Sequence, residues 1–397
     1  MLRILHVIGG LDLSDGGPPM AVSRLAGAQA YLGAQVTIAA LEPKMRRDEI
    51  LAAYSPVIGF DKIRIEYLSR GGVIERLLAR DAKQRLKPLA DQHDVIHIHG
   101  IWRPHLLAAA RVAKQLGRPY VISPHGMLST WSMTQKRLKK QLALSLVWKT
   151  VLEHAALIHV LNVDEKQAVT TICKPNKWVI LPNGINMDEL MRIPNTDPVW
   201  ERFPYLRDTS YIVFVGRLHF SKGLDILARA FAQVARVLNE IQLVVIGPDF
   251  GASAIFRSEI RRLGIDSRVH ILGGLYGAEK LALVQRASCF CLPSRQEGFS
   301  MAIIEAMAMG IPVVISDACH FPEVSAEGAG LVVKLDSSAF AQAILSLLAN
   351  ESTRRRQGAN AHGLAYSRYQ WKSIAQDFLR SYSCIAAQGS HQLTDSL

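Results

Sequence analysis

Long apolar runs are absent from this sequence of 397 residues. No stretch approaches the roughly 20 consecutive apolar residues that a helix needs to cross a bilayer. The apolar run near the start, Leu2 to Ile8, is too short for a signal peptide, and no small-residue cleavage site precedes the first predicted strand. We therefore expect a cytoplasmic protein, which could also lie peripherally on the inner face of the plasma membrane.

Cysteines are few, and their number is odd: the chain has five, widely scattered. This count argues against a framework of disulfides, so we expect reduced thiols in a cytosolic setting. Cys289 and Cys291 share one face of a predicted strand, but no other metal-type residue is close to them in the sequence. Internal short repeats and low-complexity tracts are absent as well, which excludes a repeat architecture.

The compact glycine fingerprint of dinucleotide-binding proteins is also missing. The chain opens with a predicted strand over 4–8, a loop containing Gly16 and Gly17, a helix over 20–32 and a second strand over 36–40. The loop is longer than a pyrophosphate turn, which argues against a dehydrogenase. A close approach of the loop backbone to a substrate fits better, and ordinary turn chemistry is the alternative for either glycine.

Positive charge is abundant, with a formal net charge of +12. It points to a polyanionic partner, an anionic membrane surface or phosphorylated substrates. Because the basic residues are spread over many predicted helices, we expect no nucleic-acid binding. Within 129–153, however, four cations accompany leucines at helical spacing: Lys136, Arg137, Lys139 and Lys140. We predict a basic amphipathic helix that binds an anionic membrane or a phosphorylated lipid acceptor, with a solvated helix face as the alternative.

The two halves of the sequence repeat one alternation of strands and helices, which predicts an α/β protein with two domains. Three prolines interrupt the pattern between about 191 and 208. We therefore place the first domain at 1–195 and the second at 209–365. A last helix over 366–386 carries an apolar stripe, and residues 387–397 are expected to form a disordered tail.

The stretch 294–305 combines two acidic residues with a predicted helix start. Ser300 is expected to N-cap a helix over 301–309, whose free N–H groups suit a phosphate. Glu297 precedes the helix, and Glu305 lies among apolar residues on it, where a carboxylate needs partners such as ribose hydroxyls. Parallel sheets bind ligands at this kind of edge. The alternative is an exposed Glu297 and a surface Glu305 that pairs with Arg or Lys.

Cations and histidines follow other predicted strands. Arg217 and Lys222 lie in a strand-to-helix loop and could hold a diphosphate without a metal, although two unrelated surface cations are the alternative. His125 follows a strand end and could donate to a substrate hydroxyl or phosphate, or bond a nearby carbonyl. For His97 and His99 we favour hydrogen-bonded strand-end histidines over metal ligands, because no third ligand is apparent nearby.

With these residues in order, the chain resembles the retaining glycosyltransferases of family four, which have the GT-B fold. The resemblance covers about residues 2–382. Five motifs carry it: Gly16-Gly17, His125-Gly126, Asn183-Gly184-Ile185, the pair Gly216-Arg217-Leu218 and Ser221-Lys222-Gly223, and the two glutamates Glu297 and Glu305. Asn186 departs from the pattern, since an aspartate is common there in the family.

The resemblance implies two Rossmann-like domains that face a cleft, with the C-terminal helix crossing back to the first domain. It implies a UDP-sugar or GDP-mannose donor held mainly by the second domain. It assigns the diphosphate to Arg217 and Lys222, and the ribose to Glu305. It assigns the donor sugar to Glu297 and a further donor contact to His125. The remaining donor-binding residues by the same carry-over are Gly16, Gly17, Gly298, Phe299, Ser300 and Met301.

An Asp-x-Asp metal triplet is missing, so we expect neither a metal nor another cofactor, and cations with helix dipoles would stabilise the leaving charge. The family implies retention, for which we favour a front-face displacement where the leaving phosphate takes the acceptor proton. The expected acceptor is a saccharide or lipid-linked saccharide in cell-surface polysaccharide synthesis. The alternatives are a nucleotide-sugar epimerase of the same fold and a non-catalytic nucleotide-sugar-binding protein.

Overall fold

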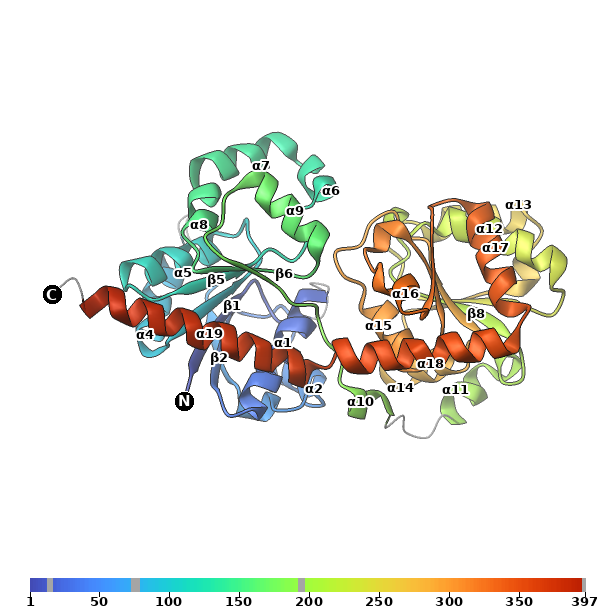
Figure 1. Cartoon of the computed structure of the whole chain (residues 1–397), viewed down its shortest axis with the longest axis horizontal. Coiled ribbons are helices and arrows are strands. Elements are labelled where there is room, and N and C mark those ends of the chain that lie inside the picture. Colours follow the sequence, from blue (N-terminus) through green and yellow to red (C-terminus); the bar gives the residue numbers. More distant parts are fainter. Residues whose placement is uncertain (13–16, 73–78, 192–196, 395–397) are drawn as a thin grey trace. The chain divides into compact units, whose positions relative to one another are not determined.

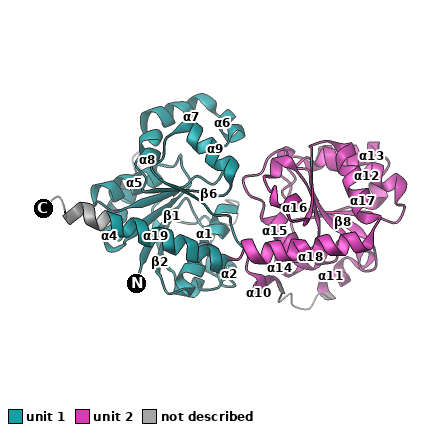
Figure 2. Cartoon of the chain, viewed as in Figure 1, with its two compact units in different colours: residues 1–184, 371–397 teal, residues 185–370 magenta. Residues whose placement is uncertain are grey.

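The computed structural model of the chain (Figure 1) describes residues 1–12, 17–72, 79–191 and 197–394. The chain forms two compact units (Figure 2): unit 1 holds Met1–Gly184 and Trp371–Leu397, and unit 2 holds Ile185–Gln370. The first division point therefore precedes the predicted boundary near residue 195. The chain returns to unit 1 at Trp371, within the predicted crossover helix.

Unit 1 is built on a seven-stranded parallel sheet in the order β3-β2-β1-β4-β5-β6-β7. Most of its strands are continuous apolar runs, as expected for a sheet with helices on both faces. The strands are β1 (Arg3–Ile8), β2 (Gln35–Leu41), β3 (Arg64–Leu68), β4 (Val95–His99), β5 (Tyr120–Ser123), β6 (Leu157–Val160) and β7 (Trp178–Ile180).

The helices of unit 1 include the C-terminal helix, α19, which contacts α1 and β4. They are α1 (Gly17–Tyr31), α2 (Arg47–Tyr54), α4 (Arg80–Gln92), α5 (Pro104–Gln115), α6 (Thr130–Thr134), α7 (Arg137–Ala143), α8 (Lys149–Glu153), α9 (Val163–Ile172) and α19 (Trp371–Thr394). The predicted stripe of α19 is confirmed, because Trp371, Ile374, Phe378 and Tyr382 are all buried in one apolar cluster. In place of the tail expected from residue 387, α19 continues to Thr394.

Unit 2 repeats the plan on a six-stranded parallel sheet in the order β10-β9-β8-β11-β12-β13. The strands are β8 (Tyr211–Val215), β9 (Gln242–Ile246), β10 (Val269–Gly273), β11 (Cys289–Leu292), β12 (Val313–Ser316) and β13 (Gly330–Val333). The helices are α10 (Met187–Met191), α11 (Asp197–Arg202), α12 (Leu224–Val237), α13 (Ser253–Arg262), α14 (Gly277–Gln285), α15 (Met301–Ala308), α16 (Glu323–Ala326), α17 (Ser337–Leu348) and α18 (Glu351–Arg368).

The strand order reverses once in each sheet, between β1 and β4 in unit 1 and between β8 and β11 in unit 2. Loops that leave neighbouring strands in opposite directions open a crevice at such a point, which is where doubly wound sheets bind ligands. The α/β fold with two Rossmann-like sheets is thus as predicted. None of the described helices combines the length and apolarity that a membrane span requires.

Candidate functional site

The site in unit 2 is formed by the two loops that leave β8 and β11 at the point where the strand order reverses. The first loop carries Arg217 and ends in a short 3-10 turn, Phe220–Lys222, before α12 begins. The second carries Glu297 and leads into α15. The sequence predicted both loops at a sheet edge, and the sheet order makes them neighbours.

Backbone contacts lock the two loops together. Gly223 has a φ of +67°, and a Cβ on it would lie 1.9 Å from the carbonyl oxygen of Pro293, so only glycine allows this approach. The N–H of Arg295 donates to the Ser221 carbonyl at 2.7 Å. The Arg295 guanidinium also pairs with Asp225 on α12 at 2.8 Å. The functional side chains between these contacts are therefore held on rigid backbone.

Lys222 and Glu297 meet directly, as a hydrogen-bonded ion pair with side chains only 14% and 8% exposed. The same carboxylate oxygen of Glu297 accepts from the Ser294 hydroxyl at 2.5 Å. The exposed Glu297 that sequence reasoning kept as an alternative is therefore wrong. A cation and an anion are thus in contact just below the surface, where a charged ligand could reach both.

Glu305 is the second acidic residue, and the structure gives it a partner that the sequence left unnamed. Lys280 on α14 donates to its carboxylate at 2.7 Å, with side-chain exposures of 18% for Lys280 and 13% for Glu305. A pairing with Arg or Lys, considered from the sequence, is thus confirmed, but the pair is mostly buried. Hydroxyl ligands of Glu305 would have to share the carboxylate with this lysine.

The start of α15 agrees only partly with the prediction. Ser300 occupies the N-cap position before Met301, but its side chain makes no capping hydrogen bond, and α15 ends at Ala308 rather than at 309. Gly298 is exposed, whereas Phe299 packs 4.9 Å from Phe321, ring centre to ring centre. The backbone N–H groups at the helix start therefore remain without a side-chain cap, and Phe299 also serves the core.

Arg217 stands apart from the ion pairs. Its side chain is exposed, and its guanidinium lies 5.2 Å from the centre of the Phe250 ring. Among the residues that the structure describes, it forms no ion pair with an acidic residue. Arg217 and Lys222 lie on the same loop, and the assignment of both to a diphosphate stays a prediction.

In unit 1, His125 lies just after β5 with a left-handed φ of +52°. Glu165 on α9 supports this turn, because its carboxylate accepts from the N–H of Gly126 at 2.5 Å and from the N–H of Leu161 at 2.8 Å. Burial raises the pKa of Glu165, and these hydrogen bonds oppose the rise. Sequence reasoning missed Glu165, although Asn162 and Glu165 have the spacing of a capping box.

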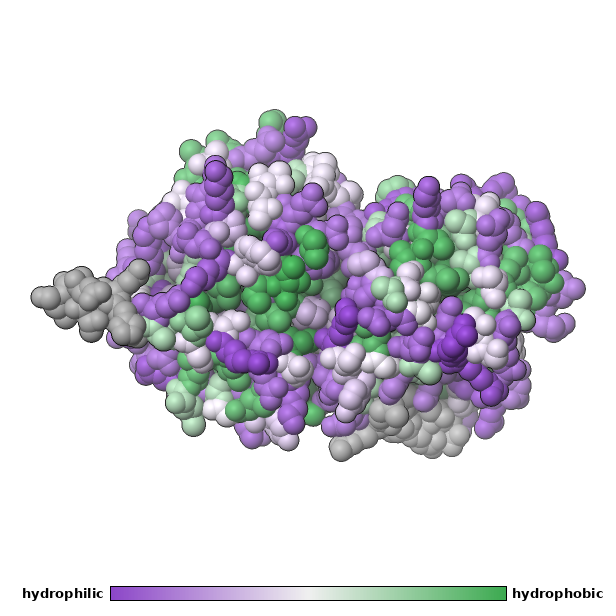
Figure 3. Space-filling model, viewed as in Figure 1, coloured by the Kyte–Doolittle hydropathy of each residue, from purple (hydrophilic) through white to green (hydrophobic). Residues whose placement is uncertain are grey.

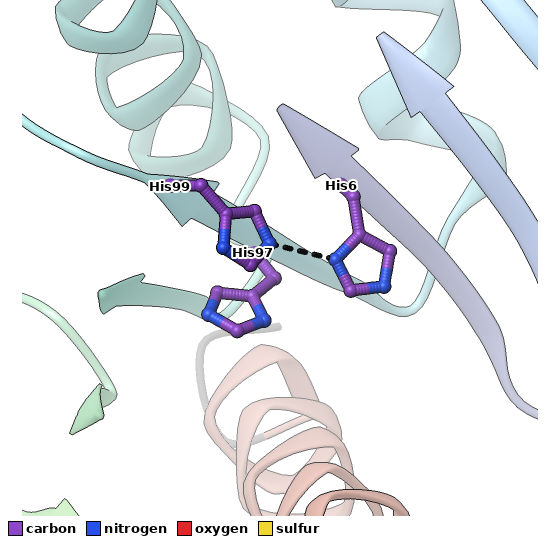
Figure 4. A group of neighbouring side chains, drawn as sticks. All are labelled: His6, His97 and His99. Atoms are coloured by element: carbon purple, nitrogen blue, oxygen red, sulfur yellow. Dashed lines mark hydrogen bonds between the residues drawn. The ribbon is translucent and has the colours of Figure 1, made fainter. Parts of the chain in front are cut away.

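His125 also belongs to a cluster of buried histidines. His6, His97 and His99 bring ligand-type nitrogens within 4.8 Å of one another (Figure 4). His6 is the third ligand that the sequence did not reveal, because it comes from β1. All their ring nitrogens are hydrogen-bonded to protein groups, so the expectation of satisfied strand-end histidines is confirmed for His97 and His99. A metal would have to displace several of these bonds.

Burial keeps these histidines uncharged. It lowers the pKa of His6 to about 4 and that of His125 to about 3, and it lowers the pKa of His97 and His99 well below the usual value. The neighbouring histidines act in the same direction on His97 and His99, because like charges would repel. The cluster is therefore a neutral hydrogen-bond network at neutral pH.

Of the two N-terminal glycines, the structure describes only Gly17. Gly16 lies outside the described residues, and Gly17 is the exposed first residue of α1, where an added Cβ would meet nothing within 4 Å. A small pocket nearby is lined by Pro18, Pro19 and His125, among others. The donor contact assigned to Gly16 and Gly17 stays a prediction, and the space around Gly17 does not demand glycine.

The basic segment 129–153 is not the single helix that the sequence predicted. Lys136 has a left-handed φ of +52° and separates α6 from α7, and a π-helical turn over Leu144–Trp148 joins α7 to α8. The segment leaves helical geometry at Lys136, and two residues of the π-helical turn, Leu144 and Trp148, are buried. A leucine stripe nevertheless survives on the outside.

Comparisons with known proteins agree with this architecture. The family model described as "Glycosyl transferase 4-like domain" matches residues 16–184, and "Glycosyl transferases group 1" matches 201–363. A phosphatidyl-myo-inositol mannosyltransferase of Mycobacterium leprae is 34% identical over 216 residues, which cover 53% of this chain and 55% of the relative. The chain thus spans about half the length of this curated relative.

Two further proteins extend the likeness over more of the chain. A GDP-mannose:cellobiosyl-diphosphopolyprenol alpha-mannosyltransferase of Xanthomonas oryzae is 26% identical over 299 residues, 73% of each chain. The structure of HepE from Anabaena, in complex with UDP-glucose, has a TM-score of 0.77 at 19% identity, covering 97% of this chain and 100% of that one, which shows the fold. With both units matched, the chain belongs to glycosyltransferase family four, with the GT-B fold.

Proposed function

We propose that the protein is a retaining glycosyltransferase that moves a hexose from a nucleoside-diphosphate sugar to a saccharide or lipid-linked saccharide. The observation that carries the proposal is the contact between Lys222 and Glu297 at the point where the strand order of unit 2 reverses. Two groups that are distant in the sequence share one position, and both are rigidly held. The named relatives transfer mannose, which supports transfer of a hexose.

In this proposal, different residues of unit 2 bind different parts of the donor. Lys222 and the exposed Arg217 neutralise the diphosphate as it leaves, together with the N–H groups of the first turn of α15, which has no side-chain cap. Glu305 binds the ribose hydroxyls while it keeps Lys280 as a neighbour. Glu297 accepts hydrogen bonds from the donor sugar, and its contact with Lys222 couples the sugar to the diphosphate. No metal is needed, because fixed cations supply the countercharge.

The chemical step that we favour is a front-face displacement. The bond from the anomeric carbon to the phosphate oxygen breaks, the acceptor oxygen bonds that carbon on the same face, and the leaving phosphate takes the acceptor proton. Retention would follow from the shared face. Mixing donor and acceptor and reading the anomeric configuration of the first product by NMR tests this, and an inverted product would contradict it.

Donor identity can be resolved by binding before any acceptor is known. Thermal shift with UDP-sugars and GDP-mannose should single out one nucleotide, since HepE is complexed with UDP-glucose and the Xanthomonas oryzae relative is named for GDP-mannose. Failure of every nucleotide sugar to bind would reject the proposed function.

The catalytic assignment is tested by Lys222→Ala and Glu297→Ala, each of which should abolish transfer in a folded protein. Arg355→Ala is the matched control, because Arg355 pairs with Glu351 on the exposed surface of α18 and should not affect transfer. Circular dichroism checks folding in all three. Full transfer by either site variant would refute its assignment.

A membrane-facing role of the segment 129–153 has structural support. Leu138, Leu142 and Leu146 are 83%, 60% and 70% exposed, and cations lie between them. Figure 3 shows apolar side chains among hydrophilic ones over the α6–α8 part of unit 1. Leucines beside lysines and arginines suit the interface of an anionic membrane, where apolar side chains insert and cations meet lipid headgroups. We propose that this surface brings the enzyme to a lipid-linked acceptor.

Flotation with anionic vesicles tests the proposal. The protein should float with them, and replacing the three leucines by Gln should abolish flotation without loss of folding. Ile255→Gln in unit 2, where Ile255 is 71% exposed, is the matched control and should float normally. Absence of wild-type flotation, or equal flotation of the triple variant, would remove the membrane part of the function.

A further inference from the structure

A buried hydrogen-bond chain in unit 1 has a direction that its first member dictates. The carbonyl of Leu181 can only accept, so the Nε2 of His159, 2.8 Å away, carries the proton of this neutral ring. The Nδ1 of His159 then accepts from the Ser123 hydroxyl at 2.6 Å. The Ser123 oxygen in turn accepts from the Nε2–H of His97, also at 2.6 Å. Each donor is therefore fixed by the one before it.

The next members of the chain are Tyr382 on α19 and Gln29 on α1. Because the Nδ1 of His97 has to accept, the Tyr382 hydroxyl donates to it at 2.5 Å, and the Tyr382 oxygen is left as an acceptor. Burial raises the pKa of Tyr382, and the neighbouring side-chain amide of Gln29 opposes the rise. The Gln29 nitrogen lacks a partner of ordinary geometry among the described residues. The Gln29 oxygen lies 2.8 Å from the Nε2 of His6, so the nitrogen is the amide atom that is turned away from His6.

The oxygen of Gln29 consequently faces His6 and fixes the rest of the chain. It accepts from the Nε2–H of His6 at 2.8 Å, and the Nδ1 of His6 accepts from the Nε2–H of His99 at 2.8 Å (Figure 4). The Nδ1 of His99 then accepts from the Nε2–H of His125 at 3.1 Å. The proton of His125 is therefore on Nε2. Its Nδ1 has no hydrogen-bond partner among the described residues, and His125 borders the small pocket of unit 1.

We propose that this chain holds His125 as the neutral Nε2–H tautomer, so that its Nδ1 accepts a hydrogen bond from a substrate hydroxyl. Gln29, His6 and His99 are then positioning residues, which act through His125. The sequence suggested His125 as a donor to a hydroxyl or a phosphate. A diphosphate oxygen carries no proton at neutral pH, so it is excluded as the partner of this lone pair. The hydroxyl partner rests on the proposed function, whereas the tautomer does not.

Nitrogen NMR of the full chain labelled with ¹⁵N-histidine tests the tautomer directly. Wild type should show His125 with a protonated Nε2 and a bare Nδ1, unchanged between pH 6 and pH 8, with the signals identified by their loss in His125→Gln. Gln29→Met removes the acceptor that fixes His6, so the second tautomer of His125 should appear. Ser23→Ala, at another buried position of α1, is the control and should keep the wild-type pattern.

A protonated Nδ1 in wild type, or an unchanged tautomer in folded Gln29→Met, would overturn the inference. If Gln29→Met does not fold, the wild-type spectrum alone decides. The outcome is separable from the proposed function. An active enzyme with the opposite tautomer rejects only the inference, and the expected tautomer in a protein that transfers no sugar rejects only the function.

Discussion

Gly223 is a residue at which the β8 loop and the β11 loop are in close contact. Its left-handed φ and the Pro293 carbonyl 1.9 Å from an added Cβ leave no room for a side chain. Lys222 precedes it, so the same contact aims Lys222 at Glu297. Packing within unit 2 thus explains the glycine of the motif Ser221-Lys222-Gly223. Its effect on the site is indirect, through the position of Lys222.

Replacing Gly223 by Ala should destabilise the protein by more than about 2 kcal/mol, because a left-handed conformation alone costs about 1–2 kcal/mol and the clash adds to it. Gly264→Ala is the matched control, since Gly264 has a nearly equal φ of +66° but open space around its Cβ position. Urea unfolding measures both. Equal losses in free energy would show that the contact with Pro293 contributes nothing.

The sequence revealed residues that lie in loops after strands but not the partners that strand order brings to them. Glu297 and Lys222 could be nominated because each follows an apolar run, and the parallel sheet then had to place them near one edge. Lys280 could not be nominated as the partner of Glu305, because it lies on a helix face with no motif. His6 could not be nominated as a neighbour of His97 and His99 either, because it is a single polar residue in an apolar strand.

At the scale of elements, α19 is the helix whose docking the sequence predicted best and whose polar contact it missed. The apolar stripe was visible from its spacing, and its burial follows from the hydrophobic effect. The stripe also ends in Tyr382, whose hydroxyl donates to His97 on β4. A tyrosine in an apolar stripe gave no sign of a polar partner far away in the sequence.

Tyr382→Phe should lower the free energy of unfolding by about 1–3 kcal/mol, because it leaves the buried Nδ1 of His97 without a donor. Tyr366→Phe on α18 is the matched control and should change little, since Tyr366 is 58% exposed. Denaturant unfolding followed by circular dichroism gives both values. A loss no greater than that of the control would mean that the hydroxyl of Tyr382 does not stabilise the docked helix.

Helix breaks are the element-scale feature that the sequence hid. The segment 129–153 has helical spacing throughout, yet Lys136 and the π-helical turn over Leu144–Trp148 divide it. Spacing reports which face is apolar, whereas tertiary packing decides where the axis bends. The exposed leucine stripe was therefore foreseeable, and the divided helix that carries it was not.

At the scale of the whole molecule, most of the histidines whose pKa is lowered by burial lie in unit 1. Burial lowers the pKa of seven histidines there: His6, His93, His97, His99, His105, His125 and His159. In unit 2, His270 also has a lowered pKa, but it is only partly buried. The folded and unfolded states of the two units should therefore differ in how many protons they bind as the pH falls.

Acid should consequently destabilise unit 1 before unit 2. The unfolded histidines protonate near pH 6.5, whereas the folded pKa is about 4 for His6 and His159 and about 3 for His125. Between those values the unfolded chain binds more protons, so stability falls as the pH falls, by roughly 1.4 kcal/mol per pH unit for each such histidine. The loss should begin near pH 6.5 and continue to about pH 4.

Hydrogen exchange at pH 7.5 and pH 5.5, corrected for the intrinsic exchange rate, distinguishes the units peptide by peptide. Protection of β1, β4, β5 and β6 should drop at the lower pH far more than protection of β8, β9, β11 and β12. Both sheets are parallel and of similar size, and the strands compared are almost entirely buried, so unit 2 serves as the internal reference. Equal losses would trace the acid sensitivity to carboxylates spread over both units, and the buried histidines would then contribute no measurable share of it.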